Sequence, residues 1–87
     1  MDIYTEAIEL WGEHSQRIMM IEECAELINF ICKQFRNRVT DSEVLKEAVD
    51  VQIMLNQLRN MLDDDILWNE QMKYKLERLE GRINANR

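Results

Sequence analysis

Hydrophobic residues recur along most of the chain at intervals of three and four, the spacing that gathers them on one face of an α-helix. Four segments carry this pattern, at about residues 2–11, 15–35, 40–62 and 63–81. Gly12 separates the first two segments, and the polar run 36–38 separates the second from the third. Thr40 and Glu43 match a capping box, which predicts the start of the third helix. The pattern therefore predicts an all-α fold with four helices.

The second predicted helix is apolar over most of its circumference. At 100° per residue, one face carries the row Ile18, Ile21, Ala25, Ile28 and Cys32, and the adjoining face carries Met20, Cys24, Leu27 and Ile31. A helix of this kind is typically buried on several sides. The third predicted helix has one core stripe, made of Val44, Ala48, Val51, Leu55, Leu58 and Leu62. The stripe of the fourth is made of Met72, Leu76, Leu79 and Ile83.

Length and composition indicate a small helical domain that associates with itself. The 87 residues include no proline and only two glycines, which disfavours a sheet protein because turns need those residues. A lone domain of this size buries only about 60–65% of its unfolded surface, yet 46% of the residues are hydrophobic. We therefore expect residues 1–87 to form one domain, a four-helix bundle completed in a homodimer or homotetramer.

Charge and cysteine content restrict the partners and the compartment. The net charge of −6 gives no electrostatic footprint for duplex nucleic acid. No segment is apolar enough to span a membrane, and the N-terminus does not resemble a signal peptide, so we expect a cytoplasmic protein. Cys24 and Cys32 would lie about 12 Å apart on one helix, too far for a disulfide. They are interpreted as small buried apolar residues in a reducing compartment.

Two pairs of acidic residues lie beside apolar positions of the second and third predicted helices. Glu23 and Glu26 form one pair, and Glu47 and Asp50 form the other; in each pair the spacing of three places both side chains on one helix face. Antiparallel packing of the two helices would bring all four acids together. Clustered carboxylates repel one another unless compensated, and oxygen ligands suit a hard cation such as Mg²⁺ or Mn²⁺.

Two other interpretations of these acids remain. Acidic pairs at this spacing usually belong to a solvated helix face, in which case the chain would be a non-catalytic helical oligomerisation or interaction module. A di-iron bundle is disfavoured, because such proteins use Glu-x-x-His pairs and the only histidine, His14, is not in one.

The string Glu22-Glu23-Cys24-Ala25-Glu26, followed by Glu47-Ala48-Val49-Asp50, resembles the EExxE…ExxD pattern of the all-α NTP pyrophosphatase superfamily. The similarity is greatest to short, phage-type MazG-like proteins, and it extends over about residues 16–83. It implies a magnesium-dependent nucleoside triphosphate pyrophosphohydrolase that maintains the nucleotide pool by converting an NTP or dNTP to the monophosphate and pyrophosphate. It also implies the metal ligands Glu23, Glu26, Glu47 and Asp50.

The same resemblance implies a catalytic role for Glu22, which would orient or deprotonate the attacking water. Basic residues are needed on the distal phosphates, and Lys33 is the first candidate, with Lys75 and Arg78 of the fourth helix next. Surface ion pairs and solvated helix ends explain these cations about as well. Two further residues, Trp11 and Trp68, are either base-stacking groups or, more often in small bundles, core or interface anchors. All four acids of the motif are present, which favours an enzyme over a degenerate copy.

Overall fold

The computed structural model covers residues 1–87 and contains helices but no strands, which confirms the predicted all-α class. The four helices are α1 (Ile3–Trp11), α2 (Glu13–Phe35), α3 (Asp41–Leu62) and α4 (Asp65–Ala85). Their boundaries agree with the predicted ones to within two residues, except that α4 continues past Gly81 to Ala85. A glycine inside a helix weakens it without ending it. None of the four helices has the combination of length and apolar character that crossing a membrane requires.

Local signals in the sequence set the breaks between the first three helices. Gly12 has φ +90°, a conformation that favours glycine, and its N–H donates to the Ile8 carbonyl at 2.8 Å, so α1 ends there. The predicted capping box is confirmed at the start of α3. The Thr40 hydroxyl accepts from the Glu43 N–H at 3.2 Å, and the Glu43 carboxylate accepts from the Thr40 N–H at 3.3 Å.

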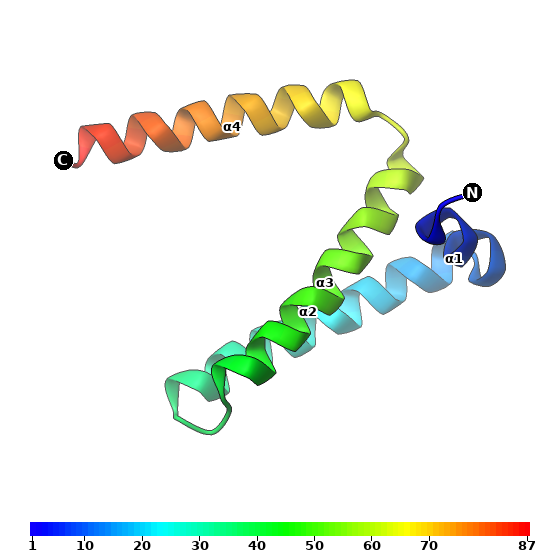
Figure 1. Cartoon of the computed structure of the whole chain (residues 1–87), viewed down its shortest axis with the longest axis horizontal. Helices are drawn as coiled ribbons and strands as arrows, with labels where there is room; N and C mark the ends of the chain where they lie inside the picture. Colours follow the sequence, from blue (N-terminus) through cyan, green and yellow to red (C-terminus); the bar gives the residue numbers. More distant parts are fainter.

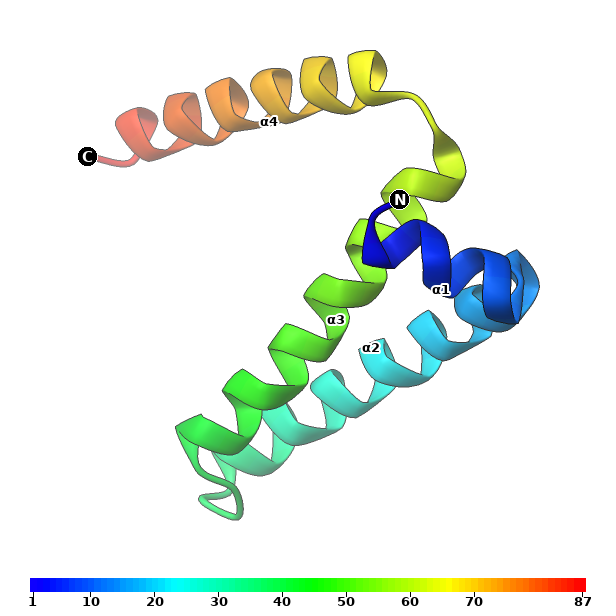
Figure 2. The same cartoon turned by 45° about the vertical axis from the view of Figure 1, so that its right-hand side comes forward.

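Helices α2 and α3 form an antiparallel hairpin, and α1 crosses the end of the hairpin opposite its loop (Figures 1 and 2). The residues between α2 and α3 alternate in steps of three and four, as in an antiparallel coiled coil. We call this set the hairpin seam; it consists of Gln16, Met20, Glu23, Leu27, Phe30 and Gln34 on α2, and of Val44, Glu47, Val51, Met54, Leu58 and Met61 on α3. Met54 is its most buried apolar member, 6% exposed.

The seam uses only part of the helix faces that the sequence predicts to be buried. The row Ile18, Ile21, Ala25, Ile28 and Cys32 lies on the far side of α2 and is exposed, so the prediction that α2 is buried on several sides is wrong for one chain. Cys32, predicted to be buried, is an exposed free thiol, and Cys24 is half-buried. On α3 the buried face is rotated, so that Ala48 and Leu62 are exposed while Glu47 takes a seam position.

Helix α4 stands apart from the other three. It leaves the C-terminal end of α3 through a short elbow at residues 63–64 and runs away from the hairpin (Figures 1 and 2). It packs along none of the other helices, and every one of its residues except Trp68 is exposed. A single chain therefore forms a three-helix unit with a projecting fourth helix, and the predicted four-helix bundle is not closed within it.

Candidate functional site

The acidic residues of the two motifs meet in the middle of the hairpin. Glu23 on α2 and Glu47 on α3 both take seam positions, and Glu26 lies one turn further along α2. One carboxylate oxygen from each of these three residues lies within 4.8 Å of the other two. Asp50 lies one turn beyond Glu47 on α3, and its charge acts on both seam glutamates. The structure thus gathers three of the four predicted acids in one cluster, with the fourth beside them.

Burial and mutual repulsion make the ionised cluster unfavourable. One oxygen of Glu23 and one oxygen of Glu47 are shielded from solvent and have no hydrogen-bond partner. Desolvation raises the pKa of Glu23, and the charges of Asp50, Glu26 and Glu22 raise it further. Desolvation also raises the pKa of Glu47, followed by the charges of Glu26, Asp50 and Glu23 and by a hydrogen bond that Glu47 and Glu26 share.

No cation of the same chain neutralises the cluster. The only ion pair in the structure joins the Arg59 guanidinium to the Asp65 carboxylate at 2.8 Å, in the elbow between α3 and α4. A buried carboxylate without a partner is costly, and removing its charge or supplying a cation relieves that cost. The donor set is oxygen only, which suits Mg²⁺, Mn²⁺ or Ca²⁺ better than a transition metal that prefers nitrogen or sulfur.

The cluster is open to solvent on one side, because Glu26 and Asp50 are exposed while Glu23 and Glu47 are half-buried. A Mg²⁺ ion keeps several waters and binds through a few carboxylates and substrate phosphates. A half-buried pair of ligands with an exposed pair beside it fits this way of binding, since solvent and a phosphate group both have access.

The remaining predicted site residues are not in the cluster. Glu22 is exposed on the flank of α2, near enough for its charge to raise the pKa of Glu23. Lys33 is half-buried two turns beyond Glu26, with its ammonium 5.4 Å from the Phe30 ring centroid. The guanidinium of Arg78 lies 5.8 Å from the ring centroid of its neighbour Tyr74 on α4.

Lys75 and Trp68 belong to a groove of about 500 Å³ at the elbow. This elbow groove is lined by Arg59, Leu62, Asp64, Leu67, Trp68, Gln71, Met72 and Lys75. The Arg59 guanidinium lies 5.2 Å from the Trp68 ring centroid, so one face of the indole is already covered. In this chain Trp68 therefore anchors the elbow, and the structure does not bring Lys75 or Arg78 to the acidic cluster of its own chain.

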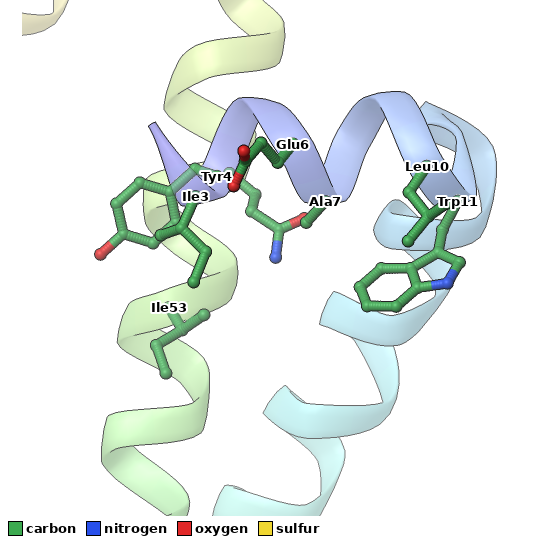
Figure 3. Close-up of a pocket in the computed structure, with 8 residues that line it drawn as sticks. Ile3, Tyr4, Glu6, Ala7, Leu10, Trp11 and Ile53 are labelled. Atoms are coloured by element: carbon green, nitrogen blue, oxygen red, sulfur yellow. The ribbon is translucent and has the colours of Figure 1, made fainter. Parts of the chain in front are cut away.

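A second groove, of about 420 Å³, lies between α1 and α3 (Figure 3). Its walls are mainly apolar and consist of Ile3, Tyr4, Glu6, Ala7, Leu10, Trp11, Ile53 and Gln57. The Asn56 amide donates to the Tyr4 hydroxyl at 2.9 Å and joins the two helices beside the groove. Of the two predicted aromatic residues, Trp11 lies in this groove.

Two buried amides of the hairpin were not predicted from the sequence. Gln16 and Gln57 are each 5% exposed, and the side-chain oxygen of Gln57 has no partner. A signal for both was present, because Gln16 precedes Glu23 by seven residues and Gln57 follows Asp50 by seven. Seven residues are two helical turns, so Gln16 lies on the same side of α2 as Glu23, and Gln57 on the same side of α3 as Asp50.

Comparison of the chain with protein-family models, with curated proteins and with solved structures finds no match.

Proposed function

We propose that the protein is a magnesium-dependent nucleoside triphosphate pyrophosphohydrolase, with Glu23, Glu26, Glu47 and Asp50 as the ligands of Mg²⁺ or Mn²⁺. One observation carries the proposal: carboxylates from two helices converge to within 4.8 Å at the centre of the hairpin, where no basic residue of the chain compensates them. Two glutamates in the seam do not stabilise the hairpin, since apolar residues at those positions would pack without electrostatic cost.

The choice of substrate follows from charge. The chain carries a net charge of −6, so a polyanionic substrate needs a bound cation to approach the acidic hairpin. A bound Mg²⁺ supplies Lewis-acid polarisation of phosphoryl oxygens. The carboxylates hold the ion, and the exposed side of the cluster admits the phosphates. The resemblance of the two acidic motifs to MazG-like proteins supports cleavage between the α and β phosphates, giving a nucleoside monophosphate and pyrophosphate.

Two other residues of the hairpin complete the proposed roles. Glu22 is exposed beside the cluster, where its carboxylate can accept a proton from, or orient, a water approaching the α-phosphate. Lys33 lies about 10 Å along the α2 axis from Glu26, so its ammonium can approach the distal phosphates of an extended triphosphate. Its contact with Phe30 is a cation–π interaction at a half-buried site, which leaves the ammonium free to turn towards an anion.

The second candidate function is a non-catalytic helical interaction module. The observation that favours it is the amount of exposed apolar surface, which includes Ile21, Ile28 and Phe35 on α2 at 64–85% exposure. Self-association accounts for the same surface in an enzyme, so we propose that the hydrolase works as a homodimer or homotetramer.

A pyrophosphate-release assay across a panel of canonical, deoxy and damaged triphosphates, with Mg²⁺ and with EDTA, tests the proposed function. We expect Mg²⁺-dependent release from at least one nucleotide, with the monophosphate as the second product. Release of inorganic phosphate alone, or no release from any nucleotide, contradicts the proposal and favours the interaction module.

A further inference from the structure

The single chain exposes more surface than its mass accounts for. Its accessible surface is 7078 Å², whereas folded monomers of 10.5 kDa expose about 5,400 Å². The surplus is about 1,600 Å² per chain, or about 3,200 Å² for two copies. Obligate homodimers bury about 2,000–5,000 Å² in total. The surplus is therefore of the size that a permanent interface between two copies would remove.

Two apolar helix faces contribute to this exposed surface. The first, which we call the outer α2 row, lies opposite the hairpin seam and consists of Ile18, Ile21, Ala25, Ile28, Cys32 and Phe35. The second, the α4 stripe, consists of Trp68, Met72, Leu76, Leu79 and Ile83. At 1.5 Å per residue the outer α2 row is about 25 Å long and the α4 stripe about 22 Å. The two faces match in length, and both are apolar.

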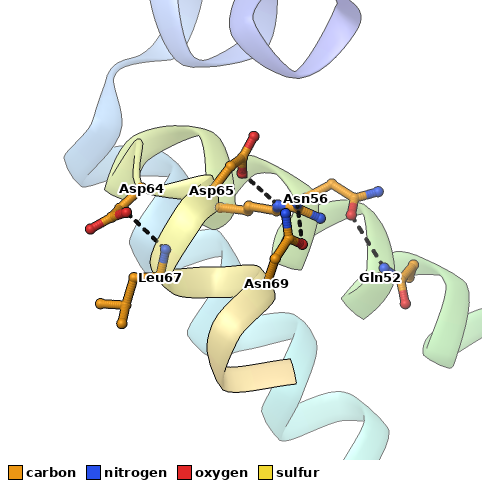
Figure 4. A network of polar contacts seen from close by, with 7 residues as sticks. Gln52, Asn56, Asp64, Asp65, Leu67 and Asn69 are labelled. Carbon is orange, nitrogen blue, oxygen red and sulfur yellow. Dashed lines mark hydrogen bonds and ion pairs between the residues drawn. The ribbon is translucent and has the colours of Figure 1, made fainter. Parts of the chain in front are cut away.

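Polar contacts at the elbow fix the start of α4 (Figure 4), and α4 packs along no other helix of its own chain. Asp63 ends α3 in the left-handed conformation (φ +48°, ψ +47°), and the Asp64 carboxylate caps α4 by accepting from the Leu67 N–H at 3.0 Å. Arg59 then ties α3 to the first turn of α4 through its ion pair with Asp65 and its contact with Trp68. Arg59 also donates to the Asn69 side-chain oxygen at 3.4 Å. These interactions fix the direction in which α4 leaves, while the helix as a whole packs along no other helix of its chain.

Most helix stability in proteins comes from packing of an apolar face, and α4, with 21 residues, packs its apolar stripe along no helix of its own chain. We propose that α4 of each chain docks on the outer α2 row of a second copy of the same chain. The exchange is reciprocal, so it closes on two copies and leaves no unpaired stripe. Docking does not depend on the proposed hydrolase function.

Charges beside the two faces select a parallel arrangement. Viewed from its N-terminus, α2 carries Glu22 and Glu26 clockwise of the outer α2 row, at 100° per residue, and Lys33 lies on the same flank two turns beyond Glu26. Viewed in the same way, α4 carries Lys75, Arg78 and Arg82 anticlockwise of its stripe. When two helices face each other, these flanks lie on the same side only if the helices run parallel. An antiparallel pair would leave the acidic flank opposite Asn69, Lys73 and Glu80.

Parallel docking also changes the acidic site. Glu22 and Glu26 lie between the outer α2 row and the seam, so the basic flank of the docked α4 comes alongside the acidic cluster. Lys75 and Arg78, which are remote from the cluster of their own chain, would thus reach the cluster of the second copy. The site would be completed in trans, and these cations would face the phosphates of a bound nucleotide if the proposed function holds.

Light scattering on full-length variants tests the docking face. Leu76, in the α4 stripe, and Tyr74, on the opposite side of α4, are almost equally exposed at 56% and 58%. We expect Leu76→Glu to weaken self-association at least tenfold, and Tyr74→Glu to assemble as the wild type does. Circular dichroism checks that both variants keep the helical hairpin. A wild-type monomer at micromolar concentration, or equal assembly of both variants, would overturn the proposal.

The natural thiol of Cys32 tests the orientation of α4, because it lies in the outer α2 row and is exposed. In a Cys24→Ser background, Ile83→Cys places a second thiol where parallel docking brings it near Cys32 of the second copy. Met72→Cys places the second thiol where antiparallel docking would bring it near Cys32 of the second copy.

We expect oxidation to give a covalent dimer with Ile83→Cys, above the level of the Cys24→Ser background, and not with Met72→Cys. A covalent dimer with Met72→Cys alone refutes the parallel arrangement. A disulfide within one chain shows that α4 folds back on its own hairpin, and the absence of any cross-link shows that α4 docks elsewhere; either result contradicts the proposal.

Discussion

Replacing Met54 by alanine tests whether the hairpin seam is what positions the acidic cluster. Met54 lies one turn beyond Asp50 on α3 and is 6% exposed. The substitution removes three heavy atoms, worth about 2.4 kcal/mol at about 0.8 kcal/mol per buried group. A residual cavity adds to this loss, and buried Met→Ala changes cost about 2–5 kcal/mol. We therefore expect the free energy of unfolding to fall by about 2.5–4 kcal/mol.

The assay is thermal unfolding by calorimetry at one fixed protein concentration, because an associating protein melts at a concentration-dependent temperature. For a domain of this size a loss of 1 kcal/mol lowers the melting temperature by about 4–8 °C, so the expected drop is at least about 10 °C. Met54→Leu keeps the volume and should cost less than about 1.5 kcal/mol. Leu45→Ala, on the outer side of α3 at 63% exposure, is the matched control. If Leu45→Ala destabilises the protein as much as Met54→Ala does, the seam is not the core.

Two further predictions concern the cation and the protons of the cluster. Mg²⁺ at about ten times its Kd should raise the melting temperature by about 5–10 °C. Glu47→Gln should reduce this shift, and Glu43→Gln should not. Equal shifts in the wild type and both variants would count against the proposed metal ligands. Without a divalent cation, the free energy of unfolding should fall as the pH rises from about 4.5 through the raised pKa values of Glu23 and Glu47, because the folded state then holds more protons than the unfolded state. Asp2, whose pKa is lowered from 3.8 by its hydrogen bond with the Thr5 N–H, loses its stabilising effect only at lower pH, so it does not obscure this window. In urea unfolding at several pH values, the double variant Glu23→Gln, Glu47→Gln should show a weaker dependence of the free energy of unfolding on pH. An unchanged dependence on pH would contradict the raised pKa values of these two glutamates.

Local signals made the helices and the acidic pairs predictable. The capping box at Thr40 and Glu43 and the glycine at position 12 act within a few residues, so the sequence alone fixes those boundaries. The spacing of three within each acidic pair is also a local property. It places Glu23 with Glu26, and Glu47 with Asp50, on common helix faces whatever the packing of the helices.

The choice of packing face was not predictable, because α2 carries two apolar rows with the same helical spacing. Ile18, Ile21 and Ile28 are as hydrophobic as Met20 and Leu27, yet the second row forms the seam. Long-range packing decides between the rows, and an interface with a second copy would account for the first. The course of α4 depends on the backbone of Asp63 and on the contacts of Arg59, which the apolar pattern of the sequence does not encode.

The most direct test of the proposed function is pyrophosphate release by the wild type, Asp50→Asn and Glu43→Gln at saturating Mg²⁺. Asp50 is exposed beside the cluster, so its replacement by asparagine deletes one charge without disturbing the seam. We predict that Asp50→Asn folds and assembles normally, because less repulsion acts on Glu23 and Glu47. Its turnover of the best nucleotide should fall at least about a hundredfold, the scale of losing a principal electrostatic contact. Glu43→Gln, one turn before Glu47 and outside the cluster, should stay near the wild-type rate. If Asp50→Asn turns over nucleotide as fast as the wild type does, the four carboxylates are not the catalytic metal site.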